Sequence, residues 1–289
     1  MDKIIKLKLD WLAFTFKPDR HELKKFYNCG SLTEHYNDDL IDSKSDLDLF
    51  FEFFPEFEKI QEDFLIMSGY SHYENVLGYL GVSDKCRISY NTEGYSTVEM
   101  GVNVSVPSHG LEWLFGLFDL NIDDDDAVQK LFLLLKERHC HCSRIDLAFD
   151  DFGKTFRPSH YITWWFNGNF RSKFRKMQIA STSRDIGNTF YLGSRKTGKM
   201  LRIYDKDFES DGVIDAVRYE FELHVDYARD MFQYLCDHAV VDFIAYLRTY
   251  FDICELKYKK DGSLDSRNKD KWSLLPEWKE WLDNLDFSE

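Results

Sequence analysis

Hydrophobic and polar residues alternate with a period of two in several short stretches of the chain. In residues 3–16, charged residues separate Ile5, Leu7, Leu9 and Trp11, which predicts a strand. The same pattern predicts four later strands, over residues 141–150, 187–194, 199–206 and 217–224. We also expect a hairpin over residues 84–105, with its turn at residues 92–94, and a second hairpin closed by residues 195–198.

Other stretches have the period of a helix. The phenylalanines of residues 46–67 lie on one broad face, which predicts a helix that Pro55 breaks or restarts. Residues 276–285 form an amphipathic pattern that packs back on the protein through two tryptophans. The remaining helices are predicted over residues 111–120, 127–139, 158–167, 226–238 and 241–251. Residues 18–45 and 259–270 are polar and are expected to connect elements. The predicted fold class is α+β, an antiparallel β-sheet with helices packed on one face.

Composition restricts the function. The 289 residues are 44% hydrophobic, enough for a sizeable core, and no apolar stretch is long enough to span a membrane. Six cysteines without an export signal indicate a reducing cytoplasm. The net charge of −14 argues against a general nucleic-acid binder, yet residues 171–206 hold ten Lys and Arg against two Asp. This basic segment indicates a local polyanion site, with a solvated basic surface as the alternative.

Three predicted strands each have one apolar face and one charged face. Because side chains alternate along a strand, three sets of residues each share a face: Arg144, Asp146 and Asp150; Arg202, Tyr204 and Lys206; and Arg218, Glu220 and Glu222. Carboxylates suit a hard divalent ion, a tyrosine can attack phosphorus, and cations can hold phosphates. This set is compatible with metal-assisted DNA strand transfer, and equally with an ion-pair network on an exposed sheet.

The stretch NTFYLGSRKTGKMLRIYDKDFES, followed by VRYEFELH, resembles the signature of the trans-acting replication initiation factor family. SRIDLAFDD resembles its upstream motif and LDWLAFTF its opening strand, so the resemblance covers residues 5–240 and is firmest over 143–224. The family includes rolling-circle Rep proteins of plasmids, related relaxases of conjugative elements and replication proteins of some filamentous phages. The resemblance implies an HUH-nuclease-like catalytic sheet and an endonuclease that nicks and rejoins DNA through a 5′-phosphotyrosine, assisted by Mg²⁺ or Mn²⁺.

The resemblance also implies residue roles. Tyr204 is the expected nucleophile, with Tyr191 as second choice, and Arg202 and Lys206 hold the scissile phosphate. The expected metal ligands are Asp146 and Glu220, followed by Asp150, Glu209 and Glu222. DNA-backbone contacts are expected from Arg195, Lys196 and Lys199 at the hairpin tip and from Arg171, Lys173, Arg175 and Lys176.

The pair His139 and His141 has the His-x-His form of metal-binding strands. By alternation both share a face with Ile145, opposite Asp146, unless a β-bulge reverses the order. A metal role for this pair is therefore less favoured than an ordinary place at the start of a strand.

The domain prediction is a catalytic nicking and joining domain over residues 1–240, with the active-site strands in 139–224, and a C-terminal helical extension over 241–289. The expected partners are origin DNA, single-stranded at the nick, and a host helicase; a homodimer is compatible with the sequence. Three alternatives remain open: a conjugative relaxase with the same chemistry, a non-catalytic DNA-binding accessory protein, and a structural phage or plasmid protein.

Overall fold

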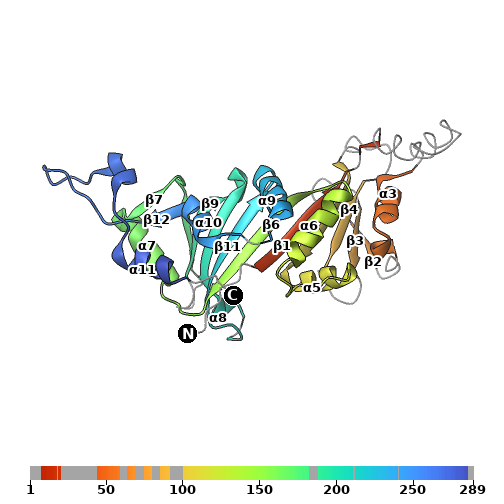
Figure 1. Ribbon diagram of the computed structural model, residues 1–289, viewed down its shortest axis with the longest axis horizontal. Helices are drawn as coiled ribbons and strands as arrows, with labels where there is room; N and C mark the ends of the chain where they lie inside the picture. Colours follow the sequence, from red (N-terminus) through yellow and green to blue (C-terminus); the bar gives the residue numbers. More distant parts are fainter. Residues whose placement is uncertain are drawn as a thin grey trace. The chain divides into compact units, whose positions relative to one another are not determined.

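The computed structural model describes residues 8–17, 19–20, 44–58, 64–68, 75–79, 85–91, 100–181, 188–210, 212–239 and 241–285. The chain divides into two compact units (Figure 1). Unit 1 comprises Met1–Lys8, Asp146–Leu223 and Val241–Glu289, and unit 2 comprises Leu9–Ile145 and His224–Val240. Strand β6 (Cys140–Asp151) begins in unit 2 and continues into unit 1.

Unit 2 is built on a sheet with the strand order β2-β3-β4-β5-β1-β6. Antiparallel pairing joins β2 to β3, β3 to β4, β4 to β5 and β5 to β1. These strands are β1 (Lys8–Phe16), β2 (Phe64–Ser68), β3 (Asn75–Tyr79), β4 (Arg87–Tyr90) and β5 (Val102–Pro107). The helices are α3 (Asp46–Phe53), α4 (Pro55–Glu58), α5 (Ser108–Leu117), α6 (Ala127–Glu137) and α9 (Asp226–Asp237).

The core of unit 2 is phenylalanine-rich. Phe14 and Phe16 of β1 are fully buried, and their rings pack against Phe50 and Phe54. Helix α3 begins where the Ser45 side chain accepts a hydrogen bond from the Asp48 amide, and it ends before Pro55, as predicted. The prediction of helix through residue 67 is wrong, because Phe64–Ser68 pairs with β3 as a strand. Short apolar runs such as FLIMS have no periodicity that separates a buried strand from a buried helix.

Unit 1 is built on a sheet with the strand order β6-β11-β10-β9-β8, in which β8–β9, β9–β10 and β10–β11 are antiparallel. These strands are β8 (Met177–Ser181), β9 (Asn188–Ser194), β10 (Lys199–Asp205) and β11 (Val217–His224). A small second sheet pairs β7 (Phe170–Ser172) with β12 (Phe251–Ile253). The helices are α7 (Pro158–Asn167), α8 (Lys206–Glu209), α10 (Phe243–Tyr250) and α11 (Pro276–Asn284), with 3₁₀ turns η3 (Arg195–Thr197) and η4 (Ser266–Lys271).

The predicted hairpin between β9 and β10 is confirmed. The Ser194 side chain accepts a hydrogen bond from the Lys196 amide and starts η3. Gly198 follows with φ of 82°, in the left-handed region that glycine enters without a steric cost. The turn therefore sets the register in which Leu201 faces Leu192 and Arg202 faces Tyr191.

Helices α7, α10 and α11 cover the apolar face of the unit 1 sheet. The Tyr161 ring of α7 packs against Tyr219, and the Phe243 ring of α10 packs against Phe221. The Trp281 ring of α11 stacks on Tyr219 at 5.7 Å between ring centroids. The C-terminal segment thus completes the core around β11, and unit 1 resumes at Val241, directly after the predicted domain boundary. None of the helices in the described residues is both long and apolar enough to cross a membrane.

Candidate active site

Strand pairing places the predicted site residues in rows across the unit 1 sheet. Arg202 lies between Tyr191 on β9 and Glu220 on β11, and the next row places Tyr204 between Thr189 and Arg218. Directly paired residues share a face, and this face is opposite the one that the helices cover. The convergence that the alternation of residues suggested is therefore confirmed for β10 and β11, and the contact of Arg218 with Asp150 extends it to β6.

Tyr204 has the surroundings of a candidate nucleophile. Its hydroxyl donates a hydrogen bond to Oε2 of Glu220 at 3.1 Å, and its side chain is 9% exposed. Arg202 forms an ion pair with the same carboxylate. The guanidinium carbon of Arg202 lies 6.0 Å, and Nζ of Lys206 5.8 Å, from the centroid of the Tyr204 ring. A phenol, a carboxylate that accepts its hydrogen bond and two cations thus lie close together at the end of β10.

Tyr191, the second choice for the nucleophile, differs from Tyr204 in the hydrogen bonding of its hydroxyl. It is half-buried and lies opposite Arg202, in the same row as Glu220. Within the described residues, no carboxylate accepts a hydrogen bond from its hydroxyl. The geometry therefore favours Tyr204 over Tyr191.

The carboxylates of this face are held by arginines. Arg218 binds Asp150 through two hydrogen bonds of 2.6 and 2.7 Å, and Arg195 binds Glu222 through two of 2.6 and 3.0 Å. Glu220 and Glu222 are almost completely buried, which makes such pairing necessary for their charge. The hydrogen bond to Glu222 raises the pKa of Arg195, and the charges of Glu222 and the buried Asp146 add to this effect.

The carboxylates do not form a ready metal site. In the part of the chain that the structure describes, no three His, Cys, Asp or Glu side chains are grouped so that they could hold a metal ion. Glu220 and Glu222 are engaged by Arg202 and Arg195. The side chain of Glu209 lies outside the described residues. The metal ligands therefore stay a prediction.

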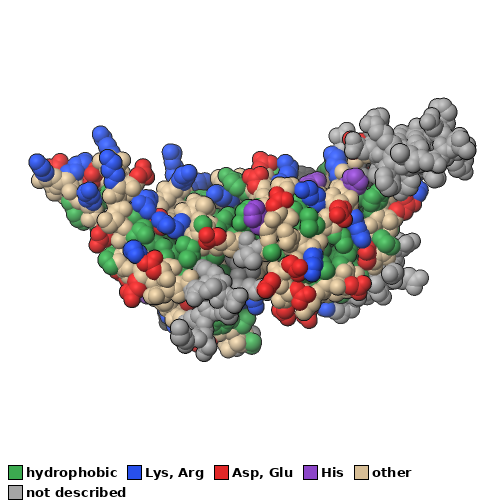
Figure 2. Space-filling model, in the orientation of Figure 1, with side chains coloured by type: hydrophobic (Ala, Val, Ile, Leu, Met, Phe, Trp, Pro, Cys, Tyr) green, Lys and Arg blue, Asp and Glu red, His purple; other side chains and the backbone are tan. Residues whose placement is uncertain are grey.

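The predicted DNA-contacting residues fall into two groups. Arg195 is bound to Glu222, Arg171 is bound to Asp252 at 2.6 Å, and Nζ of the half-buried Lys199 lies 5.1 Å from the centre of the Phe174 ring. Burial, together with the nearby charge of Lys173, lowers the pKa of Lys199. Arg195 is exposed, but Glu222 holds it. The second group has exposed side chains that form no ion pair with a described residue: Lys173, Arg175, Lys176 and Lys196. Figure 2 shows Lys and Arg side chains along one edge of unit 1. The second group is therefore better placed to reach a DNA backbone.

Burial along β6 stops alternating at Ser143 and Arg144, so His141 of the His-x-His pattern and Asp146 share a face, yet in the described residues they belong to no group of three side chains that could hold a metal ion. The His139 ring packs edge-on against Phe53. Burial lowers the pKa of the half-buried His141, and the charges of Arg229 and Lys17 lower it further. These surroundings favour the structural interpretation of the pair.

Arg218 is a site residue to which the sequence assigned no role. It lies directly opposite Tyr204 in the sheet and is 8% exposed. The signal was present in the Arg-x-Glu-x-Glu spacing of β11, which places Arg218 on the face of Glu220 and Glu222. Its partner Asp150 could be identified only after the strands were paired.

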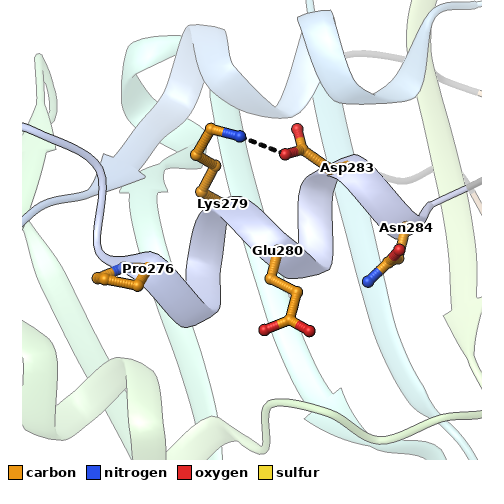
Figure 3. A pocket seen from close by; sticks show the side chains of 5 residues that line it. All are labelled: Pro276, Lys279, Glu280, Asp283 and Asn284. Atoms are coloured by element: carbon orange, nitrogen blue, oxygen red, sulfur yellow. Dashed lines mark hydrogen bonds and ion pairs between the residues drawn. The ribbon is translucent and has the colours of Figure 1, made fainter.

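A shallow depression in unit 1 lies on α11, away from these rows. It is lined by Pro276, Lys279, Glu280, Asp283 and Asn284, with an ion pair between Lys279 and Asp283 (Figure 3). None of its lining residues is a predicted site residue. We assign it no role in the chemistry.

Comparisons with known proteins identify the family and the fold. A family model described as replication initiation factor matches residues 141–287. The fold is similar to that of a rolling-circle replication initiator protein from Geobacillus stearothermophilus, with a TM-score of 0.68 and 21% identity over 97% of this chain and 96% of that chain. This likeness confirms the predicted α+β fold with an HUH-nuclease-like sheet. No curated protein matches the sequence. Because the matched residues make up more than half of the chain and include β6, β10 and β11, the chain belongs to the replication initiation factor family.

Proposed function

We propose that this protein starts rolling-circle replication by nicking one DNA strand at an origin and later rejoining it. Family membership and the likeness to a rolling-circle initiator support the role. The observation that carries the chemistry is the hydrogen bond from Tyr204 to Glu220, with Arg202 and Lys206 beside the tyrosine ring. We propose the cytoplasm as the place of action.

In the proposed reaction, Oη of Tyr204 attacks the scissile phosphorus and its proton passes to Glu220. The new bond joins the tyrosine oxygen to the 5′-phosphate, the bond between that phosphorus and the 3′-oxygen breaks, and the leaving oxygen takes a proton from water to become a 3′-hydroxyl. Arg202 and Lys206 neutralise the negative charge that develops on the phosphate oxygens during the attack. The phosphotyrosine conserves the energy of the phosphodiester, so the reverse attack by a 3′-hydroxyl rejoins the strand.

We also propose that Mg²⁺ or Mn²⁺ assists the reaction, and that a host helicase unwinds the DNA ahead of the nick. The case for the ion rests on donor chemistry, since carboxylate oxygens are the ligands that these ions prefer. Binding of an ion by Glu220 or Glu222 requires that Arg202 or Arg195 give up its present contact. A conjugative relaxase would use the same chemistry, and the likeness to a replication initiator favours replication.

The test uses single-stranded oligonucleotides tiled across the origin of the element that encodes the protein. The protein is incubated with each oligonucleotide and Mn²⁺, Mg²⁺ or EDTA, and covalent adducts are detected on denaturing gels. We expect an adduct with the wild type and Tyr191→Phe, and none with Tyr204→Phe. Tyr234→Phe, at an exposed tyrosine of unit 2, is the control variant.

Each other outcome corrects the proposal. Loss of the adduct only in Tyr191→Phe keeps the reaction and moves the nucleophile. An adduct of full yield in EDTA removes the metal from the mechanism. If no oligonucleotide yields an adduct although DNA binding is intact, the protein is an accessory DNA-binding protein and the proposed enzymatic function is wrong.

A further inference from the structure

The sheet of unit 2 has one buried face and one face with polar and aromatic side chains. Pairing aligns Ala13, Ser105 and Arg87 in one row across β1, β5 and β4. On the opposite face the side chains are fully buried: Leu12, Phe14, Phe16, Ile88, Val102, Val104 and Val106. Alternation therefore directs Arg87 and Ser105 away from the core, and Arg87 is exposed.

A stacked pair lies on this outward face. The guanidinium carbon of Arg144 is 4.1 Å from the centre of the Trp11 ring, within the range of a cation–π contact. The Trp11 indole nitrogen donates a hydrogen bond to Oγ of Ser105 at 3.2 Å, which fixes the plane of the ring. Trp11 and Arg144 are both half-buried, so their planes are held in place while part of each side chain remains at the surface.

A second set of hydrogen bonds makes the face rigid. Nδ2 of Asn103 donates to Oγ1 of Thr15 at 3.0 Å and to Oγ of Ser143 at 3.1 Å. Oγ of Ser143 donates in turn to the carbonyl of Ala13 at 3.2 Å. The strands that carry Trp11, Asn103 and Arg144 are thus tied together beside the stacked pair.

The charge of this face is opposite to that of the whole protein. The chain has 51 acidic residues against 37 Lys and Arg. The outward positions of β1, β4, β5 and the unit 2 part of β6 carry Arg87 and Arg144, and among their described side chains there is no Asp or Glu. Lys17, directly after β1, adds an exposed cation. A positive face on an acidic protein fits an anionic polymer.

We propose that this surface, the Trp11 face (Trp11, Arg87, Asn103, Ser105 and Arg144), binds single-stranded DNA. Nucleobases stack on aromatic rings and guanidinium planes, and phosphates pair with the surrounding cations. An acidic peptide would use the charges but would leave the stacked planes unused. This inference rests on the proposed function in one respect, the choice of DNA as the bound polymer. It adds a binding site in unit 2, which does not contain Tyr204.

The test measures binding of a labelled oligothymidylate of about 12 nucleotides, a length within the range of a single binding face. Trp11→Leu removes the aromatic plane, and we expect its Kd to rise about tenfold, whereas Trp11→Phe should stay within about threefold of the wild type. Arg87→Ala should lower the salt dependence of binding. Lys130→Ala, at an exposed lysine of α6 in the same unit, is the charge control.

Photocrosslinking locates the contact directly. With 5-iododeoxyuridine in the oligonucleotide, we expect a crosslinked peptide that contains Trp11. Unchanged Kd values for folded Trp11→Leu and Trp11→Phe, together with crosslinks only to other peptides, would overturn the proposal. Displacement of the DNA by polyglutamate in the wild type but not in Trp11→Leu would instead make the face a site for acidic peptides. A change in sedimentation on mutation of Trp11 would make it a contact between copies of the chain.

Failure of this inference is distinguishable from failure of the proposed function. Trp11→Leu should still form the Tyr204 adduct when a short origin oligonucleotide is saturating. Absence of an adduct in the wild type, with Trp11-dependent binding retained, would refute the nicking function and leave the Trp11 face intact.

Discussion

At the scale of single residues, two proposed roles compete for Glu220. It accepts a hydrogen bond from Tyr204 and pairs with Arg202, although the resemblance to the family suggested a metal ligand. A proton acceptor must lie within hydrogen-bond reach of the proton that it takes, and Glu220 does so at 3.1 Å. A ligand of a divalent ion needs free carboxylate oxygens, which the pair with Arg202 limits.

We expect Glu220→Gln to slow adduct formation by about 10²- to 10⁴-fold, the usual contribution of a general base. The pH dependence separates the two roles. If Glu220 takes the proton, the residual rate of Glu220→Gln should rise with pH, because hydroxide replaces the missing base. If Glu220 is a ligand, raising the Mn²⁺ concentration should restore the rate. Glu277→Gln, at an exposed carboxylate of α11, should leave the rate unchanged.

The candidate site could be predicted only in part from the sequence. Alternation correctly placed Arg202 and Tyr204 on one face of β10, and Glu220 and Glu222 on one face of β11. Strand pairing shows that these two faces form the same side of the sheet. The pairing of partners could not be predicted. Whether Arg218 meets Asp150 or Glu220 depends on strand register and on side-chain rotamers, and both of these depend on residues far apart in the sequence.

At the scale of elements, the predicted bounds were most accurate where turn-forming residues flank the hydrophobic pattern. Strand β11 and helix α7 have the predicted bounds. For the helix the reason is clear, because Pro158 begins it and Gly168 ends it in the left-handed region. The helix predicted over residues 46–67 was wrong at its end, since FLIMS pairs as strand β2. The packing of α11 through Trp278 and Trp281 is confirmed.

Helix α11 provides a test of how the C-terminal segment stabilises unit 1. Trp278 is fully buried, and its ring lies 5.4 Å from Phe251 and 5.9 Å from Phe156. We expect Trp278→Ala to lower the free energy of unfolding by about 3–5 kcal/mol, through lost burial and the cavity that remains. Urea unfolding measures the change. Lys279→Ala, exposed on the same helix, should stay within about 0.5 kcal/mol, and an equal loss in both variants would contradict the packing argument.

At the scale of the whole molecule, each of the two units is assembled from stretches that are separate in the sequence. Unit 1 takes its core from three separate segments, and unit 2 takes α9 from a segment that follows β11. Sequence patterns identify elements but not which distant elements share a core, so the assembly of unit 1 from three separate segments could not be predicted. The net charge of −14 is likewise uninformative about position, because a sum over the chain does not show where the cations lie.

The distribution of cations leads to a last prediction. DNA binding by an acidic protein must depend on the few exposed cations that meet phosphates, since each contact releases counterions. We expect Lys173→Ala, Arg175→Ala, Lys176→Ala and Lys196→Ala each to weaken binding of single-stranded DNA and to reduce the slope of log K against log salt by about 0.7. Fluorescence anisotropy across a salt series measures the slope.

Arg171 and Arg195 are unsuitable for this test, because each holds a buried carboxylate and its loss would disturb the fold. Lys279→Ala in α11 is the matched control, and its slope should equal that of the wild type. If the combined variant of all four exposed cations keeps the wild-type slope, phosphates do not meet this edge of unit 1. The electrostatic part of binding would then come from other exposed cations, and a change in slope with Arg87→Ala would assign it to the Trp11 face.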